Sequence, residues 1–266
     1  MKNNEPLLQA EDHWTTGLGA FFPGERVVYR GKDLFKDLKN KSWMGLLAFG
    51  VTGREFSDEQ LELFEKLWML SVSYPDPRLW NNRIAALAGT AKSTAALGTS
   101  GAIAVSEATI YGFRAALRTI DFLIRTAQNV EQGQKLEDLV TTELKIHRGI
   151  YGYGRPLSRN DERIEPVMAI ARQLSLADGV HIKLAFAVEE VLKQGRWRLQ
   201  MNIAAVSAAL SADQGLSARE YYSMLLPSFS AGIIPCYIDA VDSPEATFFP
   251  LRCETIQYQG PGPRSW

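Results

Sequence analysis

Apolar side chains recur at helical spacing along most of this chain, and that periodicity limits its fold more than any other feature. Leu61 and Phe64 begin one such pattern, and Ser57 with Gln60 forms a capping-box pattern just before them. A short β-branched stretch at 25–31 instead predicts a strand or hairpin arm. Further helices are predicted at 78–92, 114–128, 135–146, 164–174, 181–193, 203–211 and 218–226. The fold class is therefore predicted to be mainly α.

Length and charge exclude several classes of protein. The chain has 266 residues, of which 46% are hydrophobic, and this is enough to bury a core without disulfides. Its 29 Lys and Arg residues are balanced by 30 Asp and Glu residues. A general nucleic-acid binder needs a surplus of positive charge gathered on one face, so we expect no nucleic-acid partner.

The N-terminus and the cysteines indicate the cellular compartment of the protein. Residues 1–12 are polar and acidic and lack the layout of a signal peptide. No apolar run approaches the roughly 20 residues that a membrane helix requires. Cys236 and Cys253 are too few for a secreted disulfide framework. We therefore expect a cytoplasmic protein that does not contact a membrane.

Histidine is scarce, with three in the chain: His13, His147 and His181. They lie far apart, neither cysteine is close in sequence to a histidine, and no HExxH or DxDxDG pattern occurs, so we expect no metal site. Nucleotide-binding glycine loops of the GxGxxG and GxxxxGK[ST] types and the GxSxG elbow are also missing. His181 is expected to cap or support a helix, whereas His147 stands just before the glycine-rich tract described next.

Two tracts differ from an ordinary helix. Residues 149–154 alternate glycine with apolar and aromatic residues, which predicts a loop whose backbone is closely approached by another group. Residues 93–109 are rich in Ala, Gly, Ser and Thr. Because small side chains let backbones come close, we expect a buried helix that crosses another helix at short range, with a flexible linker as the alternative.

The glycine-rich tract carries a family resemblance. Gly152 to Pro156, followed by Asp161 to Arg163, resembles the G-[FY]-G-H-x segment and the later D-P-R of the citrate synthase superfamily. Other segments are similar to motifs of that family in the same order, namely Trp14, 28–34, 46–57, 201–205 and 228–239. The resemblance covers nearly the whole chain, and the spacing looks most like the short citryl-CoA lyase branch.

The resemblance implies an architecture. It predicts a citrate synthase-like helical fold, with a large domain built from 1–114 and 206–266 and a small domain from 115–205. The family is dimeric, and its cleft closes over the ligand. We therefore expect a homodimer, a closing cleft, and a carboxylate or acyl-CoA as the small-molecule partner.

The family chemistry needs residues that this chain lacks. In the family, one His and one Asp act as acid and base on an acyl-CoA, a second His polarises a keto group, and arginines hold carboxylates. In our alignment the loop His falls on Arg155, the Asp on Ala204 and the other His on Arg114. The D-P-R arginine persists as Arg163, and a citrate-binding arginine falls near Phe229. Arginine cannot accept a proton at neutral pH, so the usual mechanism is not expected.

The resemblance implies three groups of site residues. The catalytic candidates are Arg155, Arg114 and His147, the substrate-binding candidates are Arg163 and Arg252, and the coenzyme-binding candidates are Gly152, Tyr153 and Gly154. Arg252 would reach into the site of a partner subunit. Simpler interpretations stay open: a surface residue for Arg155, a helix-start ion pair for Arg163 and an exposed helix residue for Arg114. Tyr151 and Tyr153 are typical of packing, with Tyr153 along a bound coenzyme as the alternative.

Two hypotheses about function follow. The first is a diverged enzyme that binds an acyl-CoA or a polycarboxylate and makes or breaks a carbon–carbon bond with the help of arginine, which binds anions or polarises carbonyls without moving a proton. Coenzyme A would then enter as a thioester substrate, and no permanently bound cofactor is expected. The second is an inactive homologue that serves as a partner subunit or ligand sensor.

Overall fold

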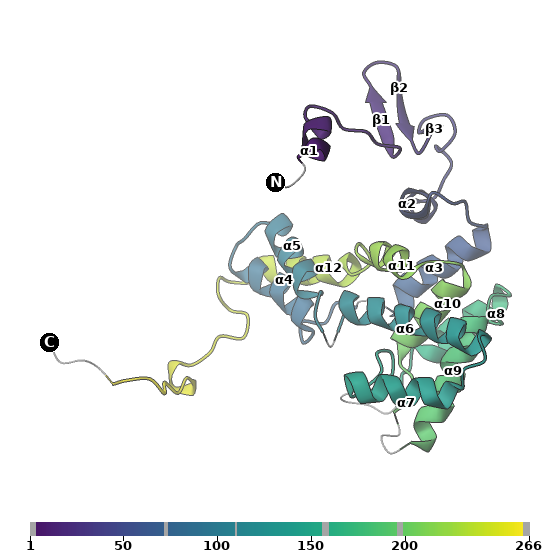
Figure 1. The fold of residues 1–266 in the computed structure, drawn as a ribbon. Coiled ribbons are helices and arrows are strands. Elements are labelled where there is room, and N and C mark those ends of the chain that lie inside the picture. The colour runs from purple at the N-terminus through teal and green to yellow at the C-terminus, as the bar shows by residue number, and fades with distance from the viewer. Residues whose placement is uncertain (1–3, 72–73, 110, 156–159, 196–198, 263–266) are drawn as a thin grey trace. The chain divides into compact units, whose positions relative to one another are not determined.

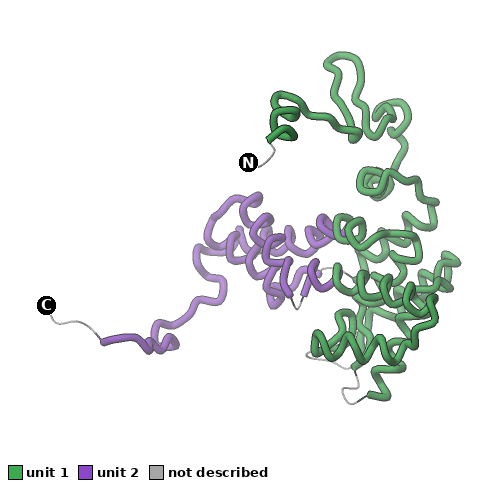
Figure 2. The backbone as a smooth tube through the Cα atoms, viewed as in Figure 1, with its two compact units in different colours: residues 1–71, 116–224 green, residues 72–115, 225–266 purple. Residues whose placement is uncertain are grey.

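The computed structural model describes residues 4–71, 74–109, 111–155, 160–195 and 199–262. These residues form many helices and a three-stranded sheet (Figure 1), so the prediction of a mainly α protein is confirmed. By backbone contacts the chain divides into two compact units. The first combines Met1–Ser71 with Ala116–Met224, and the second combines Val72–Ala115 with Leu225–Trp266 (Figure 2).

The first unit begins with a small sheet. Its N-terminal elements are α1 (Glu5–Ala10), β1 (Gly19–Phe22), β2 (Arg26–Tyr29), β3 (Lys32–Asp33) and α2 (Trp43–Thr52). The strands pair antiparallel in the order β1-β2-β3, with Gly19 opposite Tyr29. The strand predicted at 25–31 is therefore β2, the central strand of the sheet.

The first unit is otherwise helical. Its remaining helices are α3 (Asp58–Ser71), α6 (Phe113–Glu131), whose first turn lies in the other unit, α7 (Leu136–His147), α8 (Ile164–Gln173), α9 (Val180–Gln194), α10 (Ile203–Asp213) and α11 (Ala218–Leu225). The predicted capping box precedes α3. The backbone N–H of Ser57 donates to Gln60 Oε1 at 2.9 Å, and the N–H of Gln60 donates to Ser57 Oγ at 3.3 Å.

Helix α10 forms the core of the first unit. Nearly all of its side chains are buried, and most are alanine or serine. It packs against α3, α8 and α9, and small side chains allow these helices to approach it closely. A helix that is apolar all round must be covered on every side, which explains the central place of α10.

The second unit contains α4 (Trp80–Thr90), α5 (Ala95–Val105) and α12 (Ser230–Val241), with a short 3-10 turn at Cys253–Thr255. Helix α5 packs against α4 and α12, so the small-residue tract is a helix and not a linker. A Cβ at Gly98 would lie 2.9 Å from Ala88 Cβ, and one at Gly89 would lie 2.8 Å from the Tyr237 carbonyl oxygen. The predicted short-range crossing is confirmed, although Gly98 and Ala102 alone among the α5 side chains are buried.

The stretch Ala218–Val241 is apolar and long enough to cross a membrane by length and composition. Turn residues at 226–229 separate α11 from α12 within it. In the most apolar part of this stretch, 44% of the residues are buried inside the protein, and α12 packs against α4 and α5. These features are also those of core helices, so the stretch is weak support for a membrane span.

The compact units group residues by backbone contacts, whereas the predicted division into 1–114 with 206–266 and 115–205 concerns the domains of the family and stays a prediction. The predicted boundary at 205 falls inside α10, a continuous helix whose packing against α3, α8 and α9 keeps both of its ends in one unit. Residues 1–71 accordingly group with 116–224.

Candidate functional site

The glycine-rich loop is fastened to the chain that leads into α10. The N–H of Gly154 donates to the Gln200 carbonyl at 2.6 Å, and the N–H of Asn202 donates to the Gly152 carbonyl at 2.9 Å. The side chain of Asn202 adds a hydrogen bond from Nδ2 to the Gly154 carbonyl at 2.9 Å. The loop and the start of α10 therefore form one rigid structure.

The loop glycines are required by this close packing. Gly152 has φ +90°, and a Cβ there would lie 2.7 Å from Thr119 Cγ2 and 2.9 Å from Ala205 Cβ. Gly154 has φ +92°, and a Cβ there would lie 3.3 Å from Leu199 Cδ2. The close approach predicted from the sequence is thus confirmed, and at Gly152 the approaching groups are helices α6 and α10 of the same unit.

Tyr153 is a packing residue, as the simpler interpretation expects. Its side chain is buried, and its hydroxyl donates to the Ala185 carbonyl in α9 at 2.9 Å. Burial, with the nearby carboxylate of Glu189, raises the pKa of Tyr153 well above its usual value. In this conformation the ring of Tyr153 presents no open face along which a coenzyme would lie.

Asp161 organises the polar residues that follow the loop. Its two carboxylate oxygens accept from Nε and Nη2 of Arg163, both at 2.8 Å, and one of them also accepts from the N–H of Ile203 at 2.9 Å. The carboxylate is fully buried and stands at the N-terminus of α10, where it compensates the helix dipole. Burial acts to raise the pKa of Asp161, but the hydrogen bonds from Arg163 and Ile203 outweigh it, so the pKa lies below its usual value.

Arg155 joins the same group from the other side. Its Nη1 donates to Glu162 Oε2 at 2.7 Å and to the Asn160 carbonyl at 2.8 Å, and it lies 3.8 Å from Asp161 Oδ1. The structure therefore brings Arg155 and Arg163 together, as the sequence predicts. Each arginine faces a carboxylate, so the cluster of Arg155, Arg163, Asp161 and Glu162 is close to neutral, and the helix-start ion pair is the interaction observed at Arg163.

The structure places the other predicted site residues in α7 and in the second unit. His147 ends α7, where its half-exposed ring lies 3.7 Å from Glu143. Arg114 and Arg252 are exposed and belong to the second unit. Phe229, at the position of a family arginine, is buried and packs against Phe113 with ring centroids 4.5 Å apart.

His181 supports the start of α9, as predicted. Asp213, at the end of α10, accepts from the backbone N–H groups of His181 and Ile182 at 2.8 Å and 3.0 Å. The ring Nδ1 of His181 lies 2.9 Å from the same carboxylate. Asp213 therefore caps α9, and the histidine holds that carboxylate in place.

Sequence reasoning missed one polar pair beside the loop. Arg118 in α6 donates from Nη1 to the Tyr151 hydroxyl at 3.2 Å, and its guanidinium carbon lies 5.2 Å from the centroid of the Tyr151 ring. The signal that could have found Arg118 is its spacing. It follows Arg114 by one helical turn and therefore lies on the same face of the helix.

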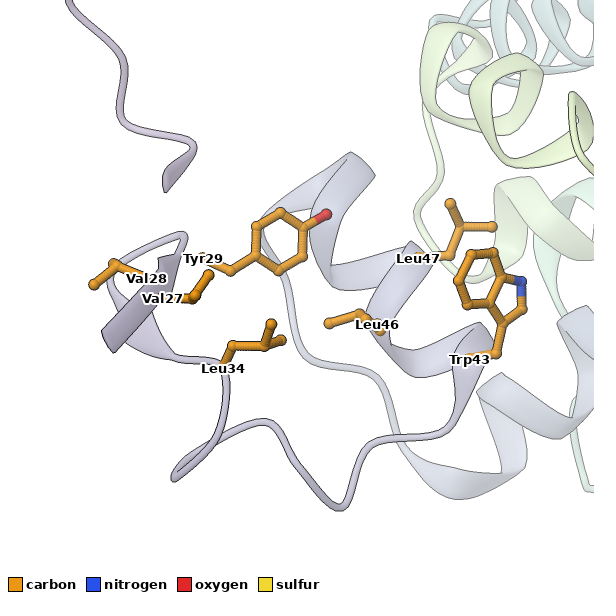
Figure 3. A pocket seen from close by; sticks show the side chains of 7 residues that line it. All are labelled: Val27, Val28, Tyr29, Leu34, Trp43, Leu46 and Leu47. Atoms are coloured by element: carbon orange, nitrogen blue, oxygen red, sulfur yellow. The ribbon is translucent and has the colours of Figure 1, made fainter. Parts of the chain in front are cut away.

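Within the described ranges, no group of three or more His, Cys, Asp or Glu side chains is placed to hold a metal ion. A cavity of about 320 Å³ lies between β2 and α2, lined by Val27, Val28, Tyr29, Leu34, Trp43, Leu46 and Leu47 (Figure 3). Its lining is apolar and includes none of the predicted site residues.

No protein-family model matches the chain, and a comparison with curated proteins finds no significant relative. Solved structures do match. Citryl-CoA lyase from Hydrogenobacter thermophilus superposes with a TM-score of 0.82 at 20% identity, over 95% of this chain and 97% of the lyase. The chain has the citrate synthase-like fold. The prediction of that fold, made from collinear motifs, is thus confirmed.

Two more structures with the citrate synthase-like fold widen the comparison. ATP citrate lyase from Methanothrix soehngenii, in complex with citrate and coenzyme A, has a TM-score of 0.75 at 18% identity over 98% of this chain and 45% of that one. Citrate synthase from Thermoplasma acidophilum, in a ternary complex with carboxymethyl coenzyme A and oxaloacetate, has a TM-score of 0.62 at 16% identity over 85% of this chain and 59% of that one. The short lyase is the relative that this chain spans almost completely.

Proposed function

We propose that this protein binds an acyl-CoA or a polycarboxylate and makes or breaks a carbon–carbon bond in it. The observation that carries the proposal is the match to citryl-CoA lyase over nearly the full length of both chains. Two other structures with this fold hold citrate with coenzyme A or a coenzyme A analogue with oxaloacetate. A thioester and a carboxylate are therefore the ligand classes to test first.

The ion pairs indicate which arginine would meet the substrate. The Glu162 side chain is 70% exposed, so a substrate carboxylate replaces it at Arg155 with little loss. Replacing Asp161 at Arg163 would leave a fully buried carboxylate without its partner. Arg155 is thus the proposed electrophile, which polarises a carbonyl or holds a carboxylate, and Arg163 supports the loop. His147 stays a candidate for proton handling, Arg114 for polarising a carbonyl and Arg252 for carboxylate binding.

Calorimetric titration with citrate, coenzyme A and acetyl-CoA tests the proposal directly. We expect saturable binding of at least one of these ligands, weakened at least tenfold in Arg155→Ala. Cleavage of citryl-CoA keeps the thioester and releases a keto acid, so turnover is then followed by the formation of oxaloacetate from citryl-CoA, or by its consumption together with acetyl-CoA. A protein that binds none of the three ligands would contradict the proposal.

The second candidate function is an inactive homologue that senses a ligand or supports a partner subunit. It is favoured by the buried aromatic side chain at Phe229 and by the methyl group at Ala204, neither of which can carry the charge that the family uses there. Binding without turnover in the same assays favours this function. Turnover that disappears in Arg155→Ala and Arg114→Ala excludes it.

We also propose a homodimer that works in the cytoplasm. The C-terminal segment exposes Phe249, Leu251, Ile256 and Tyr258 by 69%, 80%, 70% and 76%, which a stable protein normally covers. Arg252 lies among these residues, so a segment that crosses to the partner would carry this arginine with it. Light scattering after size-exclusion chromatography should give twice the chain mass, and Leu251→Asp should lower it. A monomeric wild-type protein would contradict the homodimer.

A further inference from the structure

Arg118 differs in its counter-charge from the arginines of the first unit that form ion pairs. Arg155, Arg163, Arg125 and Arg172 each lie within ion-pair distance of a carboxylate. Arg118 is partly buried, and within the described part of the chain no carboxylate lies within ion-pair distance of it. Its partner is the neutral phenol of Tyr151.

An uncompensated cation in a partly buried position favours an anion. Removing a charge from water is unfavourable unless an opposite charge or several hydrogen bonds replace the lost hydration. One hydrogen bond from Tyr151 uses one of the five guanidinium donors, and contact with the ring holds the group in place. The remaining donors are ready to form a bidentate contact with a carboxylate or phosphate.

Tyr151 adds a directed donor to the same place. Its oxygen accepts from Arg118, so its own O–H is left to donate elsewhere. The backbone fixes this position, because Tyr151 precedes Gly152, which packs against Thr119, the neighbour of Arg118 in α6. Gly152 also packs against Ala205 at the start of α10.

We propose that Arg118 and Tyr151 form a binding site for an anionic oxygen group, a carboxylate or a phosphate. Arg118 supplies the charge and two parallel N–H donors, and Tyr151 supplies an O–H donor on the same face. The identity of the ligand, a polycarboxylate or the phosphates of coenzyme A, rests on the proposed function. The existence of the anion site rests on the charge and geometry of the pair.

The experiment compares full-length Arg118→Met, Tyr151→Phe and Arg125→Met with the wild type by calorimetry against citrate, coenzyme A and inorganic phosphate. Arg125 is the matched control, because it lies on the same helix and is paired with Asp121 at 2.8 Å. We expect Arg118→Met to weaken binding at least tenfold, Tyr151→Phe severalfold and Arg125→Met not at all. Loss of citrate binding identifies a carboxylate site, and selective loss of coenzyme A binding identifies a phosphate site.

The outcomes separate this inference from the proposed function. Wild-type binding of citrate or coenzyme A that is unchanged in both Arg118→Met and Tyr151→Phe would overturn the inference and leave the proposed function standing. Phosphate binding that needs Arg118, in a protein that binds neither citrate nor coenzyme A, would support the inference and contradict the proposed function. Tyr151→Phe keeps the ring under the guanidinium, so it decides the matter if Arg118→Met unfolds.

Discussion

The arginines around Asp161 and the arginine beside Tyr151 lie in the same compact unit, but their charges are balanced differently. Arg155 and Arg163 face Glu162 and Asp161, whereas Arg118 faces a neutral phenol. The first arrangement holds a loop to a helix, and the second leaves a cation to be satisfied by a ligand. An arginine at a motif position is therefore no guide to ligand binding until its counter-charge is known.

The largest expected effect is on stability, and it tests the role of the arginines around Asp161. Asp161→Asn leaves Arg163 without its buried counter-charge, so the free energy of unfolding should fall by about 3 kcal/mol. Urea unfolding followed by circular dichroism measures this change. Asp121→Asn, which breaks the exposed pair with Arg125, should cost under about 1 kcal/mol. Equal losses in the two variants would mean that the Asp161 cluster is no more structural than a surface ion pair.

The loop glycine gives the next effect. Gly152→Ala places a methyl group 2.7 Å from Thr119 Cγ2 at φ +90°, and the combined clash and backbone strain should cost about 2 kcal/mol. Gly133→Ala is the matched control, because its φ is +89° but no atom lies within 4 Å of the added methyl group. The control measures the cost of the backbone strain alone, about 1 kcal/mol in the free energy of unfolding. Thermal unfolding of both variants should rank Gly152→Ala as less stable, and the reverse order would contradict the close packing of the loop.

Acid should weaken the Asp161 cluster. The pKa of Asp161 is lower in the folded protein than its usual value, so its contribution to stability is complete at neutral pH. That contribution is lost as the pH falls below the usual pKa and through the folded-state pKa. Melting temperatures measured from about pH 7 to about pH 3 should fall less steeply for Asp161→Asn than for the wild type. Melting temperatures that fall equally steeply in the two proteins would mean that Asp161 does not contribute to the loss of stability in acid.

The smallest effect concerns affinity. Glu162→Gln removes the exposed carboxylate that competes for Arg155, so citrate should bind severalfold more tightly with little change in stability. Calorimetry provides the measurement. Glu165→Gln, which removes the exposed partner of Arg172, is the control and should leave citrate affinity unchanged. Weaker binding in Glu162→Gln would show that Arg155 needs its carboxylate in order to meet the ligand.

Much of the fold was predictable from local pattern. The capping box at Ser57 and the strand at 25–31 depend on neighbouring residues, and both occur where the pattern places them. The predicted close approach at Gly152 was also correct, since a glycine in such a loop marks a tight backbone position. The packing around α10 was less predictable, because α10 is held by helices from several parts of the chain.

By itself, the sequence determined where most of the helices lie, which loop is tightly packed and which fold the collinear motifs imply. Only the tertiary structure decided how the arginines are used. Asp161 and the N–H of Ile203 are 42 residues apart in the chain, and Arg118 and Tyr151 are 33 residues apart. Charge balance and burial depend on such distant contacts, which leave no periodic signal in the sequence.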